Sequence, residues 1–286
     1  MYLMDEVLSK DNLKQAYLQV IRNKGASGVD EMTCEEVKEY LKVHGNDLIN
    51  QIKSREYRPQ PVRRVEIQKP NGGVRKLGIP TVIDRIIQQA LVQKMTPIFE
   101  PTFSEYSYGF RPNRRCQNAI DRTLELINQG YEWIIDIDLE KFFDNVPHDK
   151  LIRLVDNMVN DSDITALIHK YLRSGVLING TFEETEIGTP QGGNLSPLLS
   201  NIYLNELDKE LQFFMKNIDQ YEIGKYIEQV AYFTYKFIVI HPFRDGNGRI
   251  SRAIMNWLLS KKKIPPIYID QKCRKEYYDA LSCLLY

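Results

Sequence analysis

The sequence predicts a mixed fold of the α+β class over residues 1–214 and an all-helical segment over residues 215–286. Before residue 214, strand-like two-residue alternation and helical apolar spacing follow one another along the chain. Beyond Phe214, strand signals nearly vanish and apolar residues recur at helical spacing. No Gly/Ser-rich linker lies between the two parts, so we expect two domains, 1–214 and 215–286, that join abruptly.

The first elements are predicted as helix, loop, helix and hairpin. Helical spacing covers residues 10–22 and 34–54, with a turn-rich segment between them. Residues 62–68 alternate as a strand, and Pro70-Asn71-Gly72-Gly73 is typical of a hairpin turn. Residues 74–79 would form the second strand of the hairpin. Basic residues gather from Lys53 to Lys76 and again at Arg111, Arg114 and Arg115, which favours a phosphate-binding surface, with a merely solvated face as the alternative.

The later elements are predicted from the same patterns. They are helices at 83–95 and 119–128, a buried strand at 133–138 that ends in carboxylates, helices at 149–158 and 163–173, a short hairpin at 175–186, a helix at 197–213, and three final helices at 226–240, 250–259 and 271–284.

Composition indicates a soluble globular protein, because 43% of the residues are hydrophobic and the 38 basic residues balance the 38 acidic ones. The four cysteines are scattered and predict reduced thiols rather than a metal site or disulfides. No apolar run approaches the roughly 20 residues that span a bilayer, and the first residues do not resemble a secretory signal. We therefore expect a cytoplasmic protein with no membrane partner.

Two motifs point to chemistry on nucleotides. Residues 136–149 place Asp138 at the end of the predicted strand, with Phe143 following where a sugar would stack. Residues 188–201 form a glycine-rich turn that leads into a helix. Nucleotidyl transfer needs carboxylates that hold divalent metal ions, although a single Asp at a strand end is more often a turn residue.

These motifs belong to five collinear blocks that together resemble the reverse transcriptase of group II intron maturases. The blocks are residues 23–30, 69–80, 107–112, 136–149 and 188–201. The resemblance implies fingers and a partial palm that bind structured, intron-like RNA, and it implies roles for five residues. Asp138 would be a catalytic, Mg²⁺-binding aspartate, Phe143 would crowd the sugar 2′ position, Lys69 and Arg75 would meet the incoming triphosphate, and Gln191 would lie near the templating base pair.

The sequence departs from that family after residue 213. The aromatic-x-Asp-Asp motif of the family should follow there, yet no Asp-Asp pair occurs anywhere in this chain. Asp136, Asp144 and Asp149 are better explained by structural roles at a strand and a turn. We therefore expect an RNA-binding fragment without polymerase activity, which would use dNTPs only if its palm were completed.

A second motif at residues 241–252 suits phosphoryl or nucleotidyl transfer. Its glycines let the backbone curl around phosphate at a helix start, and His241 could accept a proton from an attacking hydroxyl. Asp245 could hold Mg²⁺, while Arg249 and Arg252 lie about one helical turn apart and could bind phosphate oxygens. The alternatives are a capping histidine and an ordinary or calcium-like turn.

This motif resembles that of Fic-family protein adenylyltransferases without a substitution, over a segment of residues 218–286. The resemblance implies a catalytic His241, Mg²⁺ at Asp245, ATP phosphates in a cradle of Gly246, Asn247 and Gly248, outer phosphates on Arg249 and Arg252, and a protein target for AMP transfer. The upstream helices and the docking flap of that family are missing. Three interpretations remain open: a nucleic-acid-binding reverse transcriptase fragment, an AMP transferase, and an inert fusion.

Overall fold

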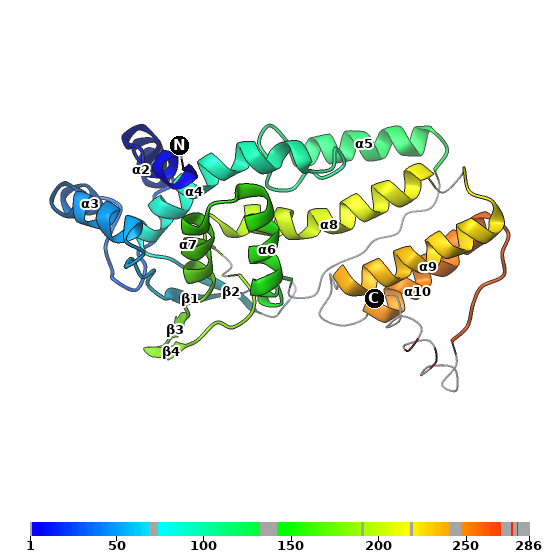
Figure 1. Ribbon diagram of the computed structural model, residues 1–286. Helices are drawn as coiled ribbons and strands as arrows, with labels where there is room; N and C mark the ends of the chain where they lie inside the picture. The colour runs from blue at the N-terminus through cyan, green and yellow to red at the C-terminus, as the bar shows by residue number, and fades with distance from the viewer. Residues whose placement is uncertain are drawn as a thin grey trace. The chain divides into compact units, whose positions relative to one another are not determined.

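The computed structural model describes residues 2–68, 72, 74–131, 142–189, 192–217, 220–240, 247–269, 276 and 279. The chain packs as two compact units, and the described residues of the first end at Tyr203 while those of the second begin at Leu204. Figure 1 shows the elements in chain order, from blue at the N-terminus to red at the C-terminus. The predicted mixed fold is confirmed, because the first unit combines helices with a sheet and the described part of the second is helical. The predicted division of the chain into the domains 1–214 and 215–286 stays a prediction.

The described helices follow the predicted apolar patterns. They are α1 (Leu3–Val7), α2 (Lys10–Arg22), α3 (Val37–Lys53), α4 (Val82–Phe99), α5 (Cys116–Asn128), α6 (His148–Val159), α7 (Ser162–Leu172), α8 (Ser196–Asn217), α9 (Ile223–Ile240) and α10 (Asn247–Lys261), with the 3-10 turns η1 (Glu100–Thr102) and η2 (Phe142–Asp144). The short α1 was not predicted, because five residues carry too little periodicity. The strand predicted at 133–138 lies outside the described residues, and so does nearly all of the helix predicted at 271–284.

The described strands form one four-stranded sheet in the order β2-β1-β3-β4. Their bounds are β1 (Val62–Gln68), β2 (Val74–Ile79), β3 (Val176–Ile178) and β4 (Thr181–Glu183). β1 pairs with β2 in antiparallel register, so that Arg64 lies opposite Gly78 and Glu66 lies opposite Lys76. Since alternate residues share a face, these four positions lie on the same side of the hairpin. β1 also pairs with β3 in parallel, which joins the hairpin to the chain that leads into the 188–201 motif.

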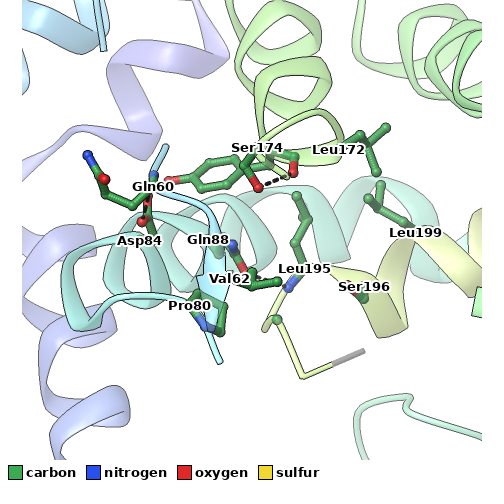
Figure 2. A pocket seen from close by; sticks show the side chains of 12 residues that line it. Gln60, Val62, Pro80, Asp84, Gln88, Leu172, Ser174, Leu195, Ser196 and Leu199 are labelled. Atoms are coloured by element: carbon green, nitrogen blue, oxygen red, sulfur yellow. Dashed lines mark hydrogen bonds between the residues drawn. The ribbon is translucent and has the colours of Figure 1, made fainter. Parts of the chain in front are cut away.

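Helix α4 is the centre of the first unit, and its residues from Val82 to Gln88 are all buried. The Asp84 carboxylate accepts hydrogen bonds from the Tyr57 hydroxyl at 2.6 Å and the Thr81 hydroxyl at 2.7 Å. Burial raises the pKa of Asp84, and these hydrogen bonds oppose the rise. Figure 2 shows Asp84, Gln60 and Gln88 among the side chains that line a cavity of about 20 Å³. The network fixes the chain that enters β1 to the first turn of α4.

The loop at residues 23–30, one of the five blocks, is clamped by two arginines. Arg63 donates to the Ser27 carbonyl and Arg85 donates to the Ala26 carbonyl, each at 2.7 Å. A Cβ atom at Gly28 would lie 2.6 Å from the Thr81 Cα, closer than any side chain tolerates. The loop therefore needs glycine where it passes the start of α4.

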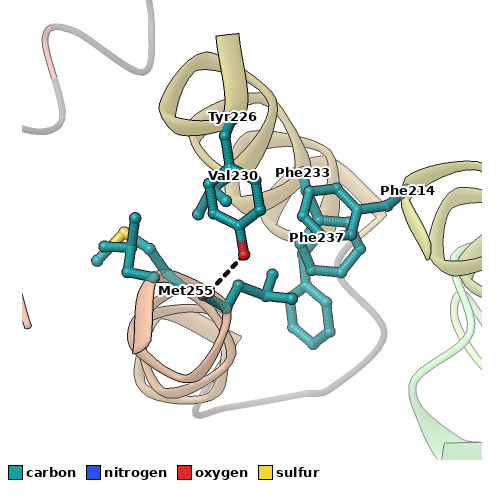
Figure 3. Packing of buried hydrophobic residues seen from close by; sticks show 8 residues of the cluster. Phe214, Tyr226, Val230, Phe233, Phe237 and Met255 are labelled. Carbon is teal, nitrogen blue, oxygen red and sulfur yellow. Dashed lines mark hydrogen bonds between the residues drawn. The ribbon is translucent and has the colours of Figure 1, made fainter. Parts of the chain in front are cut away.

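The second unit has its own aromatic core, drawn in Figure 3. Phe214 at the end of α8 packs on Phe233 of α9 with ring centroids 5.1 Å apart. Tyr226 of α9 donates a hydrogen bond to the Leu258 carbonyl of α10, where Met255 adds a further buried side chain. These contacts hold α9 and α10 together as a helical pair. Within the described ranges, none of the helices combines the length and apolar character that a bilayer span requires.

Candidate functional site

Two segments that are distant in sequence are joined by backbone hydrogen bonds in the first unit. The Thr189 amide donates to the Phe143 carbonyl at 2.6 Å, and the Gly188 amide donates to the Val146 carbonyl at 2.9 Å. The ring nitrogen Nε2 of His148 lies 2.6 Å from the Gly188 carbonyl oxygen. We call these contacts the seam. The seam brings the end of the 136–149 motif against the start of the 188–201 motif.

Glycines make this close approach possible. Gly188 has a φ of +93°, and a Cβ atom there would lie 2.7 Å from the Phe143 carbonyl oxygen. Gly192 has a φ of +116°, and its Cβ atom would lie 2.5 Å from the Gly78 carbonyl oxygen of β2. Both positions therefore require glycine for conformation and for space. The loop is held against η2 through one glycine and against the hairpin through the other.

A cavity of about 590 Å³ lies at the seam. Its polar and aromatic lining comes from the hairpin, from η2, and from the end of β4 with the chain that follows it: Arg64, Lys76, Phe143, Asp144, Glu183, Glu184, Thr185, Glu186 and Thr189. Phe143 is the predicted site residue that the structure places in this cavity. Its ring packs edge-on to Phe142 at 5.6 Å, which fixes its position.

Two polar groups in the lining have no hydrogen-bond partner among the described residues. They are Nε of Arg64 and Oγ1 of Thr189, and Thr189 is only 3% exposed. Buried polar groups are normally paired, so both are suited to a ligand that supplies oxygen atoms, such as a phosphate. Among the described residues of the lining, four carboxylates outnumber the cations of Arg64 and Lys76. A polyphosphate would therefore bind there with accompanying cations rather than bare.

His148 supports the seam in its neutral form. It is 5% exposed, and burial lowers its pKa, while the hydrogen bond to the Gly188 carbonyl acts in the opposite direction. Because that carbonyl only accepts hydrogen bonds, the neutral ring donates through Nε2. His148 is thus a structural contact of the seam and was not predicted as such.

Several predicted site residues lie outside what the structure describes. These are Lys69, Asp138, Gln191, His241, Asp245 and Gly246, together with the side chain of Arg75, whose backbone is part of β2. In the described ranges, no group of three or more His, Cys, Asp or Glu side chains could hold a metal ion. The predicted magnesium sites at Asp138 and Asp245 therefore stay predictions.

The first turn of α10 carries the remaining predicted residues of the second motif. Asn247 is 5% exposed, and the Ser251 hydroxyl donates to the Gly248 carbonyl at 3.2 Å. The Arg252 guanidinium folds back over this turn, with Nη1 3.1 Å from the position of a Cβ atom at Gly248. Arg249 is exposed on the same helix. The structure thus gathers Asn247, Gly248 and Arg252 at one helix start.

One residue of the predicted phosphate-binding surface has a different role. The Arg111 side chain is only 3% exposed and forms an ion pair with Glu100 at 2.8 Å. It also donates to the Ser107 carbonyl at 2.8 Å. The prediction that Arg111 meets phosphate is wrong, because charge clustering in sequence does not reveal that Glu100 becomes its partner.

Sequence reasoning missed most of the cavity lining. It placed Arg64 and Lys76 in a general basic cluster, although two-residue alternation on paired strands puts both on one face. Nothing local marks Thr189 or the glutamates at 183, 184 and 186 as neighbours of that face. Their proximity depends on the pairing of β1 with β3.

Comparison with known proteins gives three findings on the first resemblance. Residues 67–234 match the family described as reverse transcriptase (RNA-dependent DNA polymerase). The group II intron-encoded protein LtrA of Lactococcus lactis subsp. cremoris is 42% identical over 214 residues, covering 73% of this chain and 35% of LtrA. This chain thus spans about a third of that relative. A chain of the solved partial Cas6-RT-Cas1--Cas2 complex has a TM-score of 0.51 at 26% identity, covering 74% of this chain and 35% of its own.

The second resemblance has a counterpart in the protein adenylyltransferase Fic of Culex quinquefasciatus. It is 34% identical over 137 residues, covering 44% of this chain and 25% of that protein. A segment of that length exceeds residues 218–286, so the similarity includes residues N-terminal to 218. It therefore overlaps the match at 67–234, which itself continues beyond the predicted boundary at 214.

We predict that Gly188→Ala destabilises the first unit more than Gly130→Ala. Both glycines have a φ of +93°, but a Cβ atom at Gly130 meets no atom within 4 Å, whereas at Gly188 it meets the Phe143 carbonyl. Both variants bear the backbone strain, and Gly188→Ala adds a steric cost of about 1–3 kcal/mol. Urea unfolding of the two full-length variants measures the difference, and equal losses would show that the seam does not need this close approach.

Proposed function

This chain belongs to the reverse transcriptase family, and from that membership we propose that its first unit binds structured, intron-like RNA and a nucleotide at the seam. The observation that carries the nucleotide proposal is the pair of buried, unpartnered groups, Arg64 Nε and Thr189 Oγ1, which line one cavity with Lys76 and Phe143. Arg64 and Thr189 would donate to phosphate oxygens, and Phe143 would contact the sugar. The group II intron-encoded relative and the Cas complex that contains a reverse transcriptase support a nucleic-acid partner.

We further propose that the chain does not extend a primer in isolation. Two-metal catalysis needs carboxylates from more than one motif, and the 286 residues contain no Asp-Asp pair. Asp138 would bind Mg²⁺ with a dNTP, and a complete palm would be required for catalysis. RNA contacts would come from exposed basic side chains between Lys53 and Lys76, such as Arg58 and Lys76, and not from Arg111. We propose that the RNA binding and the nucleotide binding take place in the cytoplasm.

A second candidate function is AMP transfer from ATP to a protein hydroxyl. The intact 241–252 motif favours it, together with the helical pair whose first α10 turn gathers Asn247, Gly248 and Arg252. His241 would accept the proton of the attacking hydroxyl, Asp245 would hold Mg²⁺ and Arg249 would bind an outer phosphate. The similarity to the Culex Fic protein supports this assignment. An inert fusion remains the outcome if neither ligand binds.

The first function predicts that the purified chain binds a fluorescent dNTP in the presence of Mg²⁺ without incorporating it on an RNA template. Arg64→Gln should weaken dNTP binding about tenfold, since it removes a charged phosphate donor worth roughly 1.5–3 kcal/mol. The control Arg173→Gln removes an exposed arginine outside the cavity lining and should leave binding unchanged. Equal effects of both substitutions would contradict the assigned cavity. Template-dependent incorporation that disappears in Asp138→Ala would contradict the lack of polymerase activity.

The second function predicts that label from ATP carrying a radioactive α-phosphate appears on protein. His241→Ala should abolish this transfer while sparing ATP binding, because the base acts on the acceptor, whereas Asp245→Ala should weaken binding itself. A gel autoradiograph with a parallel filter-binding assay separates the two effects. Labelling that persists in His241→Ala would rule out the assigned base.

A further inference from the structure

Helix α3 is anchored at its two ends and stands away from the rest of the first unit along its middle. Only Val37 and Ile52, near its two ends, are buried. Leu41, Leu48 and Ile49 along its inner face are half-buried and line a cavity of about 660 Å³. The middle of this apolar face therefore lacks the close packing expected of an amphipathic helix.

This cavity is a groove between two helices with a third helix as its floor. Leu13 and Tyr17 of α2 form the wall opposite α3, and Ile83, Ile86 and Ile87 of α4 form the floor. The 17 residues of α3 span about 25 Å, which is the length of a helix of several turns. Gly45 lies in the lining with no atom within 4 Å of a Cβ position, so the groove is open beside the middle of α3. None of these residues lines the cavity at the seam.

Four exposed lysines follow the two sides of the groove. Lys10 and Lys14 lie on α2, and Lys38 and Lys42 lie on α3, so each side carries two cations one helical turn apart. In the described ranges, the only ion pair of these four is between Lys42 and the exposed Glu39. Cations spread along both sides match rows of carboxylates, whereas a lipid or fatty acid would concentrate its negative charge at one end.

We propose that the groove between α2 and α3 docks an amphipathic helix of a partner protein, with leucine-like side chains on α4 and acidic residues toward the four lysines. Apolar anchors would supply affinity by covering the half-buried side chains, and the acidic rows would set the orientation. A nucleic acid would match the lysines but not the apolar floor. This docking site is independent of the nucleotide cavity and of the second motif.

A designed peptide tests the proposal on the full-length chain. The probe is a fluorescent, hydrocarbon-stapled helix with leucines on one face and glutamates on both flanks, and its control carries lysines in place of the glutamates. Anisotropy should show the glutamate peptide binding about tenfold more tightly than the lysine peptide. Lys14→Glu combined with Lys38→Glu should remove that preference. Arg22→Glu, an exposed charge reversal on α2 outside the groove, should preserve it.

A second pair of variants tests the groove without changing charge. Gly45→Phe should fill the open space and abolish peptide binding, because its side chain would occupy the position of an anchor. Val43→Phe adds the same ring at a position on α3 that is 72% exposed and outside the groove, and it should leave binding intact. Circular dichroism establishes that each variant keeps the thermal midpoint of the parent.

Three results would overturn the proposal: equal binding of the two peptides, peptide binding that survives Gly45→Phe, and no binding of the glutamate peptide. In the last case, palmitate or a 20-nucleotide RNA that binds in a manner dependent on Lys14 and Lys38 would identify the groove as a lipid or RNA site instead.

Discussion

The candidate site depends on one constraint, the seam in which Phe143, Val146 and His148 meet Gly188 and Thr189. Its hydrogen bonds join residues that are 40 to 46 positions apart, and they satisfy backbone groups that burial would otherwise leave unpaired. The aromatic ring of Phe143 and the hydroxyl of Thr189 line one cavity because of these bonds. The neutral state of His148 follows from the same burial. The hydrogen bonds of the seam thus determine which side chains line the cavity.

The charges around that cavity determine what it can bind. Two cations alone would favour any anion, but Asp144 and the three glutamates make the described part of the lining acidic on balance. The proposed nucleotide would match both sets of charges if it bound together with cations, which carboxylates and phosphates both attract. Binding a nucleotide and joining it to a primer have different requirements. The proposed binding would take place at the seam, whereas the joining step would need an Asp-Asp pair, which the 286 residues do not contain.

Local patterns predicted the parts of the fold that local forces determine. Two-residue alternation gave β1 and β2 with the bounds that the structure has, and apolar spacing gave α2 as Lys10–Arg22. Phe143 was predicted as a site residue and lies in the cavity. Arg111 was misplaced because its partner, Glu100, becomes a neighbour only through the path of the chain after α4. Thr189 and the glutamates near β4 could not be predicted, since the parallel pairing of β1 with β3 and the close approach of Gly192 to Gly78 bring them to the hairpin.

Amide hydrogen exchange measured residue by residue tests the seam most directly. Gly188 and Thr189 belong to a loop, yet both residues are buried and their amides donate to the Val146 and Phe143 carbonyls, so they should exchange as slowly as the core amides of α4. The turn at Asn179 and Gly180 is exposed and provides the fast reference. Protection at Gly188 and Thr189 close to that of α4 is the predicted result. Exchange as fast as in the 179–180 turn would contradict the seam and the cavity that depends on it.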